Sequence, residues 1–487
     1  MSSDLHMYFA AAGCGKTSAL MQLVKEKLYG KNSTIKSRAD FKQLRFISFT
    51  KIAAEVTKQR LSKLTGISVH ELGPICSTLH SMCFRTLGAS KTAMMRAEDY
   101  TDFGNRAGYN LGQLRTSRIR QEDIDWKDLR DIYLCNADST YRNNPKTVQE
   151  RANSDTMARL SRFMALYSSY RQSVNRMDFT DLLEKYLEEG RVEEGVRCVF
   201  VDEAQDLTPL QWKVVFQAFR NCTEMHVAGD PNQAIFSFAG GDPSVLVRLK
   251  GTPHYLDTSY RVPANILKVA TTITSQIPTT ERAEFEIHSF IGRNGTFADI
   301  KVEEEALKKG HVIKNRAGII KVVPDLDCVP INPKLSYMML AANRIRLKRF
   351  TTFCERQGIM YSRTGVPVFN FTELRHPEKL TGDRKALYDR MRASGFVPPP
   401  SEVFSAQTVE ALSANINTIH GVKGDEADVV IIDPDMQPNT YKQSGSAPSE
   451  LHRLYYVAVT RAKAAVYVLA PKQLGSYLPM VEAIRCL

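Results

Sequence analysis

The sequence predicts an α/β fold in which short buried strands alternate with helices around two central parallel sheets. Three observations support this prediction. Compact apolar runs, typical of parallel strands buried on both faces, recur at residues 45–49, 196–201, 225–228, 337–340, 429–432 and 466–469. Apolar residues at helical spacing fill the intervals between these runs. A glycine-containing loop joins the first strand, residues 7–9, to a helix, which is a junction that α/β proteins use for binding phosphate.

The composition is typical of a globular protein long enough for several domains. Hydrophobic residues make up 43% of the 487 positions without any run of about eighteen, so we expect no membrane span. Residues 1–15 do not show a charged segment followed by an apolar one, so we expect no secretion signal. The net charge of +12 favours a polyanionic partner. The nine cysteines include no Cys-x-x-Cys pair, which gives no zinc or iron–sulfur spacing and favours a reducing compartment. We therefore expect a cytoplasmic location, meaning the host cytoplasm for a phage-encoded chain.

The loop at residues 10–17, Ala-Ala-Ala-Gly-Cys-Gly-Lys-Thr, has the pattern of a phosphate-binding loop, with Ala10 in place of the usual first glycine. Small residues let backbone N–H groups approach phosphate oxygens, and the start of the following helix favours negative charge. Lys16 is expected to reach the β- and γ-phosphate oxygens, and the Thr17 hydroxyl to bind Mg²⁺. The loop residues expected at the nucleotide are Ala12, Gly13, Cys14, Gly15, Lys16, Thr17 and Ser18.

An acidic segment, Val-Asp-Glu-Ala-Gln-Asp at residues 201–206, directly follows an apolar run. Adjacent carboxylates often mark only a solvated turn. Here the phosphate loop in the same chain favours phosphoryl chemistry, in which Asp202 holds Mg²⁺ through its water shell and Glu203 orients and deprotonates the attacking water. The two motifs together predict a nucleotide triphosphatase.

Four further blocks follow in order along the chain. They are residues 229–238 (Gly-Asp-Pro-Asn-Gln-Ala-Ile-Phe-Ser-Phe), 258–261 (Thr-Ser-Tyr-Arg), 418–426 (Thr-Ile-His-Gly-Val-Lys-Gly-Asp-Glu) and 456–463 (Tyr-Val-Ala-Val-Thr-Arg-Ala-Lys). With the pairs at 49–50 and 53–54 and the block at 78–81, they closely resemble the motifs of the UvrD/Rep-type superfamily 1 DNA helicases, from about residue 8 to 468. The resemblance implies a P-loop NTPase with two RecA-like domains that uses ATP and Mg²⁺.

The resemblance also implies a domain organisation. The first RecA-like domain, which binds ATP, comprises residues 1–89 and 191–254, and residues 90–190 form a helical insertion within it. The second comprises residues 255–365 and 410–487, with its sheet beginning near Tyr255. Relatives carry a large insertion in the second domain, whereas residues 366–409 leave room only for a reduced one. Phe179 and Leu182 of the first insertion are expected to be packing residues. Such compactness would suit a phage or mobile-element protein.

Roles at the ATP site follow residue by residue from the resemblance. Arg261 and Arg461 match the two arginines that neutralise the γ-phosphate, and Gln233 matches the glutamine that senses it. Tyr260 is expected to stack on the base, and Glu426 to accept hydrogen bonds from the ribose hydroxyls, with ordinary packing or surface positions as the alternatives. Tyr260 then carries most of the base contact, because the glutamine segment by which relatives read adenine has no counterpart before Tyr8. The expected catalytic residues are Lys16, Glu203, Gln233, Arg261 and Arg461, and the expected metal ligands are Thr17 and Asp202.

Aromatic and hydroxyl side chains are expected along a DNA strand. In relatives the aromatics that match Phe236 and Phe238 stack on bases of single-stranded DNA, although Tyr and Trp are commoner there, and core packing is the alternative. The other residues expected to contact the strand are Phe49, Thr50, Thr78, His80, Thr418 and His420. For the two histidines a buried structural role is the alternative. The basic group at residues 344–349 is expected to be a solvated face rather than a DNA contact.

The resemblance implies an ATP-dependent DNA helicase that translocates 3′ to 5′ on single-stranded DNA and unwinds duplex DNA. The alternative is a DNA-stimulated ATPase translocase that displaces proteins without unwinding, which the reduced insertion leaves open. A binding module with a degenerate ATP site is disfavoured by intact Lys16, Glu203 and Arg461. Single-stranded and tailed duplex DNA are the expected partners, with replication or repair proteins as further candidates, no membrane, and a monomer. DNA and RNA as the track are not distinguished by these residues.

Overall fold

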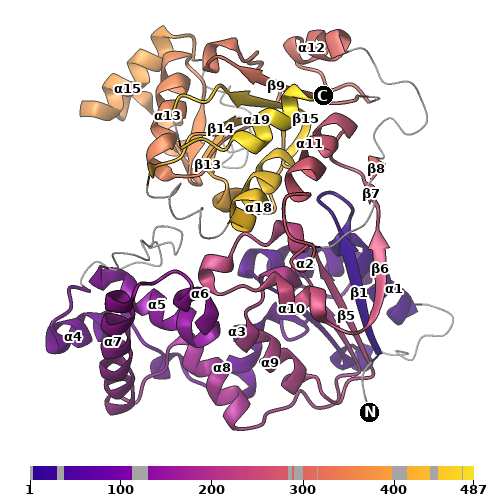
Figure 1. Cartoon of the computed structure of the whole chain (residues 1–487), viewed down its shortest axis with the longest axis vertical. Coiled ribbons are helices and arrows are strands. Elements are labelled where there is room, and N and C mark those ends of the chain that lie inside the picture. The colour runs from indigo at the N-terminus through magenta and orange to yellow at the C-terminus, as the bar shows by residue number, and fades with distance from the viewer. Residues whose placement is uncertain are drawn as a thin grey trace. The chain divides into compact units, whose positions relative to one another are not determined.

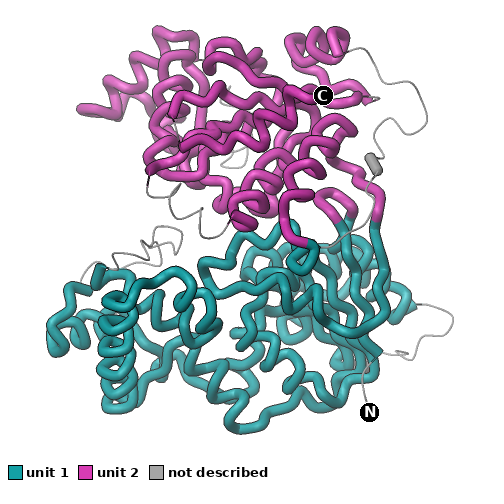
Figure 2. The backbone as a smooth tube through the Cα atoms, viewed as in Figure 1, with its two compact units in different colours: residues 1–10, 15–256, 279–285 teal, residues 11–14, 257–278, 286–487 magenta. Residues whose placement is uncertain are grey.

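The computed structural model describes residues 4–29, 38–111, 130–282, 288–289, 300–314, 316–396, 414–438, 448–473 and 475–487. The chain divides into two compact units, each of which is described by itself (Figure 2). Unit 1 comprises residues 1–10, 15–256 and 279–285, and unit 2 comprises residues 11–14, 257–278 and 286–487. Among the described helices, none is both long enough and apolar enough to cross a membrane.

A six-stranded parallel sheet forms the centre of unit 1. Its order is β3–β2–β4–β5–β1–β6, which places β1, the strand that leads into the phosphate loop, between β5 and β6 (Figure 1). The strands are β1 (Asp4–Ala10), β2 (Leu44–Ser48), β3 (Cys76–Thr78), β4 (Cys198–Val201), β5 (Glu224–Gly229) and β6 (Thr252–Leu256). The inner strands β2, β4 and β5 are buried along most of their length, which explains their continuous apolar runs.

Helices cover both faces of this sheet, and the two-residue period of β4 decides which side chains meet them. Phe200 joins the apolar cluster under α1 (Lys16–Tyr29) and α2 (Lys51–Thr65). Val199 joins the cluster under the helices of the opposite face, which are α3 (Leu79–Thr86), α8 (Phe179–Glu188) and α9 (Pro209–Ala218). The short helix α10 (Pro243–Arg248) contributes Leu246 to this second cluster.

A helical segment lies between α3 and β4, as the sequence predicts. Its helices are α4 (Ala97–Ala107), α5 (Asp131–Asn143), α6 (Pro145–Gln149), α7 (Ser154–Ser173) and α8. The helices α4 to α7 have an apolar core of their own, which includes Phe103, Leu134, Leu160 and Phe163. Leu182 on α8 is fully buried, as expected, but Phe179 is 62% exposed, so the packing prediction is wrong for Phe179. Phe179 is the first residue of α8 and lies beyond the buried part of that helix.

Unit 2 is built on a seven-stranded sheet in the order β12–β11–β13–β10–β14–β15–β9. All neighbours pair in parallel except β11 and β12. The strands are β9 (Ile319–Val323), β10 (Tyr337–Ala341), β11 (Tyr361–Arg363), β12 (Val366–Pro367), β13 (Ala414–Thr418), β14 (Ala427–Asp433) and β15 (Ala462–Leu469). The expectation that the second sheet begins near Tyr255 is wrong, because Tyr255 lies in β6, which pairs with β1 as the edge strand of the first sheet.

Two groups of helices pack on the sheet of unit 2. The first group contacts β9, β14 and β15 and consists of α11 (Ala264–Thr274), α18 (Pro448–Val459) and α19 (Leu478–Arg485). The second contains α13 (Leu347–Arg356) and α15 (Gly382–Ala393), which pack together over an apolar cluster that includes Phe350, Met391 and Ile431. The helix α12 (Ile300–Lys308) lies beside β9. Between β12 and the last residue described before β13, residue 396, the helices are α14 (Phe371–Arg375) and α15 and a single 3₁₀ turn.

Candidate functional site

The phosphate loop begins at the carboxyl end of β1 and runs into the first turn of α1. Gly13 and Gly15 have φ angles of 77° and 78°, in the left-handed region that only glycine adopts at low cost, so both loop glycines are required by backbone geometry. The Lys16 side chain is buried, and its Nζ donates a hydrogen bond to the Ala10 carbonyl at 3.1 Å across the loop. The predicted loop thus has the backbone curvature that directs N–H groups at a phosphate.

The predicted metal ligands Thr17 and Asp202 lie together in unit 1. The Thr17 hydroxyl donates to Asp202 Oδ2 at 2.8 Å. Burial, and then the neighbouring Glu203 carboxylate, raise the pKa of Asp202 to about 6, although Thr17 and Lys16 act in the opposite direction. A buried carboxylate beside a hydroxyl, with a raised pKa, is a site that a divalent cation would stabilise. Their hard oxygen atoms fit Mg²⁺.

Glu203, the predicted general base, has a strained backbone. Its φ of 54° places it in the left-handed region, which is uncommon for a residue with a side chain. Its carboxylate accepts a hydrogen bond from Gln205 Nε2 at 2.5 Å. The side chain is therefore held in place by a neighbour two residues along the chain.

Gln205 has a role that the motif did not reveal. This amide is fully buried, and its Oε1 accepts from the Asp230 backbone N–H at 3.0 Å while its Nε2 donates to Glu203. Asp230 in turn accepts from Gln233 Nε2 at 2.6 Å. A chain of hydrogen bonds therefore runs from Glu203, the predicted general base, through Gln205 and Asp230 to Gln233, the predicted γ-phosphate sensor. The one sign of this role in the sequence is that Gln205 is an uncharged polar residue inside an acidic motif.

The nucleotide residues predicted in the second domain are brought together within unit 2. Glu426 precedes β14 and pairs with Lys463 at 2.9 Å and with Arg261 at 3.5 Å. Burial alone would raise the pKa of Glu426, but Lys463 and Arg261 outweigh it and hold the pKa below its usual value. Lys463 was not predicted as a site residue, although it ends the last motif.

Arg461 and Tyr260 have very different environments. Arg461 is 1% exposed, and its guanidinium donates to the carbonyls of Val457 and Asp425, at 3.0 and 3.3 Å. The Tyr260 side chain is 61% exposed, while its backbone N–H donates to the Gly13 carbonyl within unit 2. The exposed ring of Tyr260 therefore stays a predicted stacking contact for the base.

Three predicted strand-contacting phenylalanines form a ring cluster in unit 1. Phe49 stacks on Phe236 with ring centroids 5.7 Å apart, and Phe236 meets Phe238 edge to face at 6.0 Å. All three side chains are partly exposed, and Phe49 also packs against the apolar cluster of the sheet, so their contact with a strand stays a prediction. Phe49 follows β2, and Phe236 and Phe238 follow β5, so the cluster lies at the carboxyl ends of these strands.

Thr50 and Thr78 are the N-caps of α2 and α3. Thr50 accepts from the Ala53 N–H at 3.1 Å, and Thr78 accepts from the Ser81 N–H at 3.3 Å. Both helices start at the carboxyl end of a strand, β2 and β3, and helix N-termini favour phosphate groups. The two threonines therefore fit the predicted contact with a strand backbone, and they also begin their helices.

His80 is partly buried in the first turn of α3, and burial lowers its pKa to about 4. The exposed ring of Phe179 packs edge to face against it, with centroids 5.7 Å apart. Phe179 is therefore an exposed aromatic beside His80, a predicted strand contact. Its position at the start of a helix gave no sequence signal for exposure.

In unit 2, Thr418 ends β13, and His420 stands in the turn that follows. Thr418 is 2% exposed, and its hydroxyl oxygen has no hydrogen-bond partner among the described residues. A buried hydroxyl without a partner is costly, so this atom suits an external acceptor or donor such as a strand phosphate. His420 is only partly buried, so both its predicted contact with the strand and the structural alternative remain open.

The basic group at residues 344–349 is not simply a solvated face. Arg346 binds Asp433 and Asp435, which are both fully buried, and Arg349 lies 3.6 Å from Asp433. These ion pairs fasten the start of α13 to the end of β14. Lys348 and Arg349 line an open cavity of about 470 Å³ with Arg356 and Lys472.

One cluster has metal-ligand chemistry away from the phosphate loop. Cys198, Glu224 and His226 place one ligand atom each within 4.8 Å of one another. They are neighbours on β4 and β5, where any facing side chains lie this close. Glu224 is already paired with Lys27 at 2.5 Å and with His226 at 3.2 Å, so the carboxylate is satisfied without a metal. These residues pack beside the Lys27–Glu224 ion pair, and all nine cysteines are free thiols.

The fold and this site define a phosphate-loop nucleotide-binding protein with two largely parallel sheets. The family model described as the UvrD/REP helicase N-terminal domain matches residues 5–254, and that of the UvrD-like helicase C-terminal domain matches residues 413–469. The chain belongs to the UvrD/REP helicase family.

Individual relatives are distant and longer. The chain is 26% identical over 290 residues to the ATP-dependent DNA helicase Rep of Buchnera aphidicola, a match that covers 55% of this chain and 40% of that protein. It is 26% identical over 280 residues to the ATP-dependent DNA helicase PcrA of Staphylococcus aureus, covering 54% of this chain and 37% of that protein. A short match of 62 residues to the RecBCD enzyme subunit RecB of Mycobacterium tuberculosis is 44% identical and covers 13% of this chain and 6% of that protein.

Proposed function

We propose that the protein is an ATP-dependent DNA helicase that moves 3′ to 5′ on single-stranded DNA and separates duplex strands. The observation that carries this proposal is the hydrogen-bond chain in unit 1 from Glu203 through Gln205 and Asp230 to Gln233. Gln233 is three residues before Phe236, which stacks on Phe49. The chain therefore joins a residue proposed for hydrolysis to the aromatic cluster proposed for the strand, which is what a nucleic-acid-driven ATPase requires.

In this proposal the phosphate loop and the acidic motif have distinct tasks. The loop N–H groups and Lys16 hold the phosphates of ATP, and Thr17 and Asp202 hold Mg²⁺, which supplies positive charge to the phosphate oxygens. Glu203 accepts the proton of the attacking water. Gln233 senses the γ-phosphate through the same hydrogen-bond chain.

Unit 2 supplies the remaining tasks. Arg261 and Arg461 are proposed to neutralise the charge that develops on the transferred phosphoryl group, since guanidinium groups bind such oxygens in pairs. Tyr260 would stack on the base, and Glu426 would accept from the ribose hydroxyls. The predicted organisation, with an ATP-binding domain at 1–89 and 191–254, stays a proposal.

The strand contacts in this proposal are of two kinds. Phe49, Phe236 and Phe238 stack on bases, which is tolerant of sequence and worth about 1–3 kcal/mol per base. Thr50, Thr78, His80, Thr418 and His420 contact phosphate and sugar, and Phe179 adds a further exposed ring beside His80. We expect a monomer acting on single-stranded and tailed duplex DNA in a reducing cytoplasm, with replication or repair proteins as candidate partners.

Two assays test the proposal. ATP turnover is measured with single-stranded DNA, duplex DNA and RNA of equal length, and single-stranded DNA is expected to stimulate most. Strand displacement is then compared on duplexes with a 3′ or a 5′ single-stranded tail. Unwinding of the 3′-tailed duplex is expected, and a preference for the 5′ tail would overturn the polarity.

A second candidate function is a DNA-stimulated translocase that displaces bound proteins without unwinding. The observation that favours it is the small number of elements between β12 and residue 396, namely α14, α15 and one 3₁₀ turn, where relatives are expected to have a large insertion. Stimulated ATP turnover, removal of a streptavidin block from biotinylated single-stranded DNA and no separation of either tailed duplex would select this function.

A further inference from the structure

Two consecutive asparagines at the end of α5 contact the two segments that follow the acidic and aromatic motifs. Asn144 is 6% exposed, and its Nδ2 donates to the Gly240 carbonyl at 3.1 Å. Gly240 closes the 3₁₀ turn that contains Phe238, and its N–H binds the Ser237 carbonyl at 2.9 Å. The end of the aromatic segment is therefore tied to the helical insertion.

Asn143 makes the matching contact with the acidic motif. Its Oδ1 accepts from the Thr208 hydroxyl at 3.0 Å, and Thr208 follows the acidic segment by two residues. Thr208 is also the N-cap of α9, where its hydroxyl oxygen accepts from the Gln211 N–H at 3.1 Å. The hydroxyl thus donates and accepts at once, which fixes its orientation. Asn143 Nδ2 donates to the Ser139 carbonyl at 2.9 Å and to Thr180 at 3.2 Å.

Gly240 is packed between these side chains. A Cβ atom on Gly240 would lie 3.4 Å from Thr208 Cγ2 and 3.5 Å from the Cβ atoms of both Asn143 and Asn144, and its φ is 94°. The Asp242 N–H also donates to the Leu207 carbonyl at 3.3 Å. The segments 206–208 and 236–242 therefore lie side by side, and Asn143 and Asn144 contact both of them.

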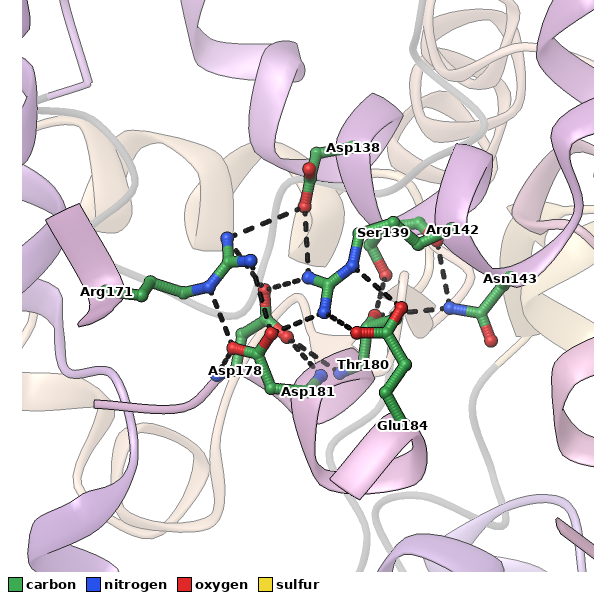
Figure 3. A network of polar contacts seen from close by, with 9 residues as sticks. All are labelled: Asp138, Ser139, Arg142, Asn143, Arg171, Asp178, Thr180, Asp181 and Glu184. Carbon is green, nitrogen blue, oxygen red and sulfur yellow. Dashed lines mark hydrogen bonds and ion pairs between the residues drawn. The ribbon is translucent and has the colours of Figure 1, made fainter. Parts of the chain in front are cut away.

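The residue before the pair anchors α5 inside the insertion. Arg142 donates to both carboxylate oxygens of Glu184, to Asp181, and to Asp178 at 3.0 Å (Figure 3). Arg171 contacts Asp178 and Asp181 from α7, at 3.5 and 2.8 Å. Breaking one ion pair of this largely buried network would leave a charge without a partner, which costs folding free energy. The last turn of α5 is therefore fixed to α8.

We propose that Asn143 and Asn144 are positioning residues that hold the aromatic segment 236–242 against the segment 206–208, and so couple strand binding to the acidic motif. The inference rests on the proposed function, in which Phe236 and Phe238 contact single-stranded DNA. The physical basis is conformational entropy. A segment already ordered by Asn144 loses less freedom when a strand binds, so the strand binds more tightly.

The test uses Asn144→Asp in the 487-residue chain. The substitution preserves size but replaces the amide donor by an oxygen that cannot donate to the Gly240 carbonyl. ATP turnover is measured against the concentration of single-stranded DNA and, separately, of ATP. The strand concentration that gives half-maximal stimulation should rise about tenfold, the equivalent of one buried hydrogen bond, while the KM for ATP changes less than about twofold.

Two further variants keep this test decisive. Asn144→Ala removes the donor without adding charge. It should also raise the half-maximal strand concentration while leaving the KM for ATP nearly unchanged. This variant controls for the case in which the carboxylate of Asn144→Asp disturbs folding. Asn153→Ala is the matched control, because Asn153 caps α7 in the same insertion through the Thr156 N–H but contacts neither motif segment. It should lower thermal stability and leave the half-maximal strand concentration near the wild-type value.

The outcomes separate this inference from the function beneath it. If wild-type turnover ignores single-stranded DNA, or if Phe236→Ala with Phe238→Ala leaves stimulation unchanged, the proposed strand contact fails and the inference falls with it. If the phenylalanine variant weakens stimulation but both Asn144 variants behave as wild type, the inference alone is overturned. If the KM for ATP rises by the same factor as the half-maximal strand concentration, Asn144 has a general structural role. That result would also overturn the inference.

Discussion

Glu203 is the residue whose chemistry can be separated most cleanly from binding. Glu203→Gln keeps the hydrogen-bonding shape but cannot accept the proton of water, so ATP should still bind while turnover falls, on the order of a hundredfold to ten-thousandfold. Binding of a fluorescent ATP analogue and steady-state turnover, measured on the same preparation, check this. Equal loss of both would mean that Glu203 is structural.

Lys16 gives the contrasting result. Lys16→Ala removes the buried ammonium that spans the phosphate loop, so we expect both nucleotide affinity and turnover to be lost. Arg248→Ala on α10 is a matched removal of one positive charge elsewhere in unit 1. If Lys16→Ala turned over ATP at the wild-type rate, the loop would not be the site of hydrolysis.

His226 should make stability depend on pH. Burial, only partly opposed by Glu224, lowers its pKa from 6.5 to about 4. The native state therefore stays unprotonated while the unfolded state takes up a proton, so stability is lost as pH falls from about 6.5 to about 4. His226→Gln should flatten this part of the dependence of the unfolding midpoint on pH, measured by urea denaturation. The exposed His70→Gln is the control, and an unchanged slope in His226→Gln would contradict the assignment.

Sequence could identify site residues but not their hydrogen-bond partners. The phosphate loop and acidic motif were recognisable because each chemical role is tied to one residue type at one spacing. The link from Gln205 to the Asp230 N–H was not, because it joins positions that approach only when β4 and β5 pair. Phe179 was misassigned for a similar reason, since periodicity does not show where the neighbouring elements end.

At the scale of elements, the aromatic segment after β5 should act as a unit. Replacing Phe236 and Phe238 together by Ala removes a ring pair that is only partly buried, so single-stranded DNA should stimulate ATP turnover less while turnover without DNA is retained. Phe216→Ala is the matched control, because Phe216 is an exposed ring on α9 stacked on Trp212. Loss of the circular dichroism signal in the double variant would instead support a core role.

Five of the seven predicted strands agree with the structure to within two residues, because burial on both faces leaves a continuous apolar run. The prediction for residues 45–49 corresponds to β2, and that for 225–228 lies within β5. β15 begins at Ala462, earlier than predicted, because its first residues are small or charged. The ion-pair network of the insertion was not predictable, since Arg142 pairs with residues up to 42 positions away.

At the scale of the whole molecule, the two arginines of unit 2 should differ. Arg461 is buried and bonded to backbone carbonyls, whereas Arg261 is bound to the Glu426 carboxylate. Arg261→Ala should lower kcat on the order of a thousandfold with little change in nucleotide affinity, if it acts on the γ-phosphate. Arg461→Ala should also lower the melting temperature. If a variant keeps its kcat but loses its affinity for ATP, the replaced arginine does not act on the γ-phosphate during hydrolysis.

Loading onto single-stranded DNA should depend strongly on salt. The net charge of +12 and the proposed phosphate contacts imply release of counterions, so the logarithm of affinity should fall linearly with the logarithm of salt concentration. Fluorescence anisotropy of a labelled oligonucleotide at several salt concentrations measures the slope. The Phe236 and Phe238 double variant should weaken affinity without changing this slope, because ring stacking displaces no ions. A flat salt dependence would argue against backbone contacts.

The left-handed backbone of Glu203 sets its proposed catalytic role against the stability of the folded protein. A side chain in that conformation costs on the order of 1 kcal/mol or more, a cost that glycine largely avoids and asparagine reduces. Folding alone therefore favours replacing this glutamate, whereas its proposed role in hydrolysis would retain it. In related proteins that keep this fold but no longer hydrolyse ATP, position 203 should be among the first to change. The residue at this position would therefore distinguish relatives that hydrolyse ATP from relatives that do not.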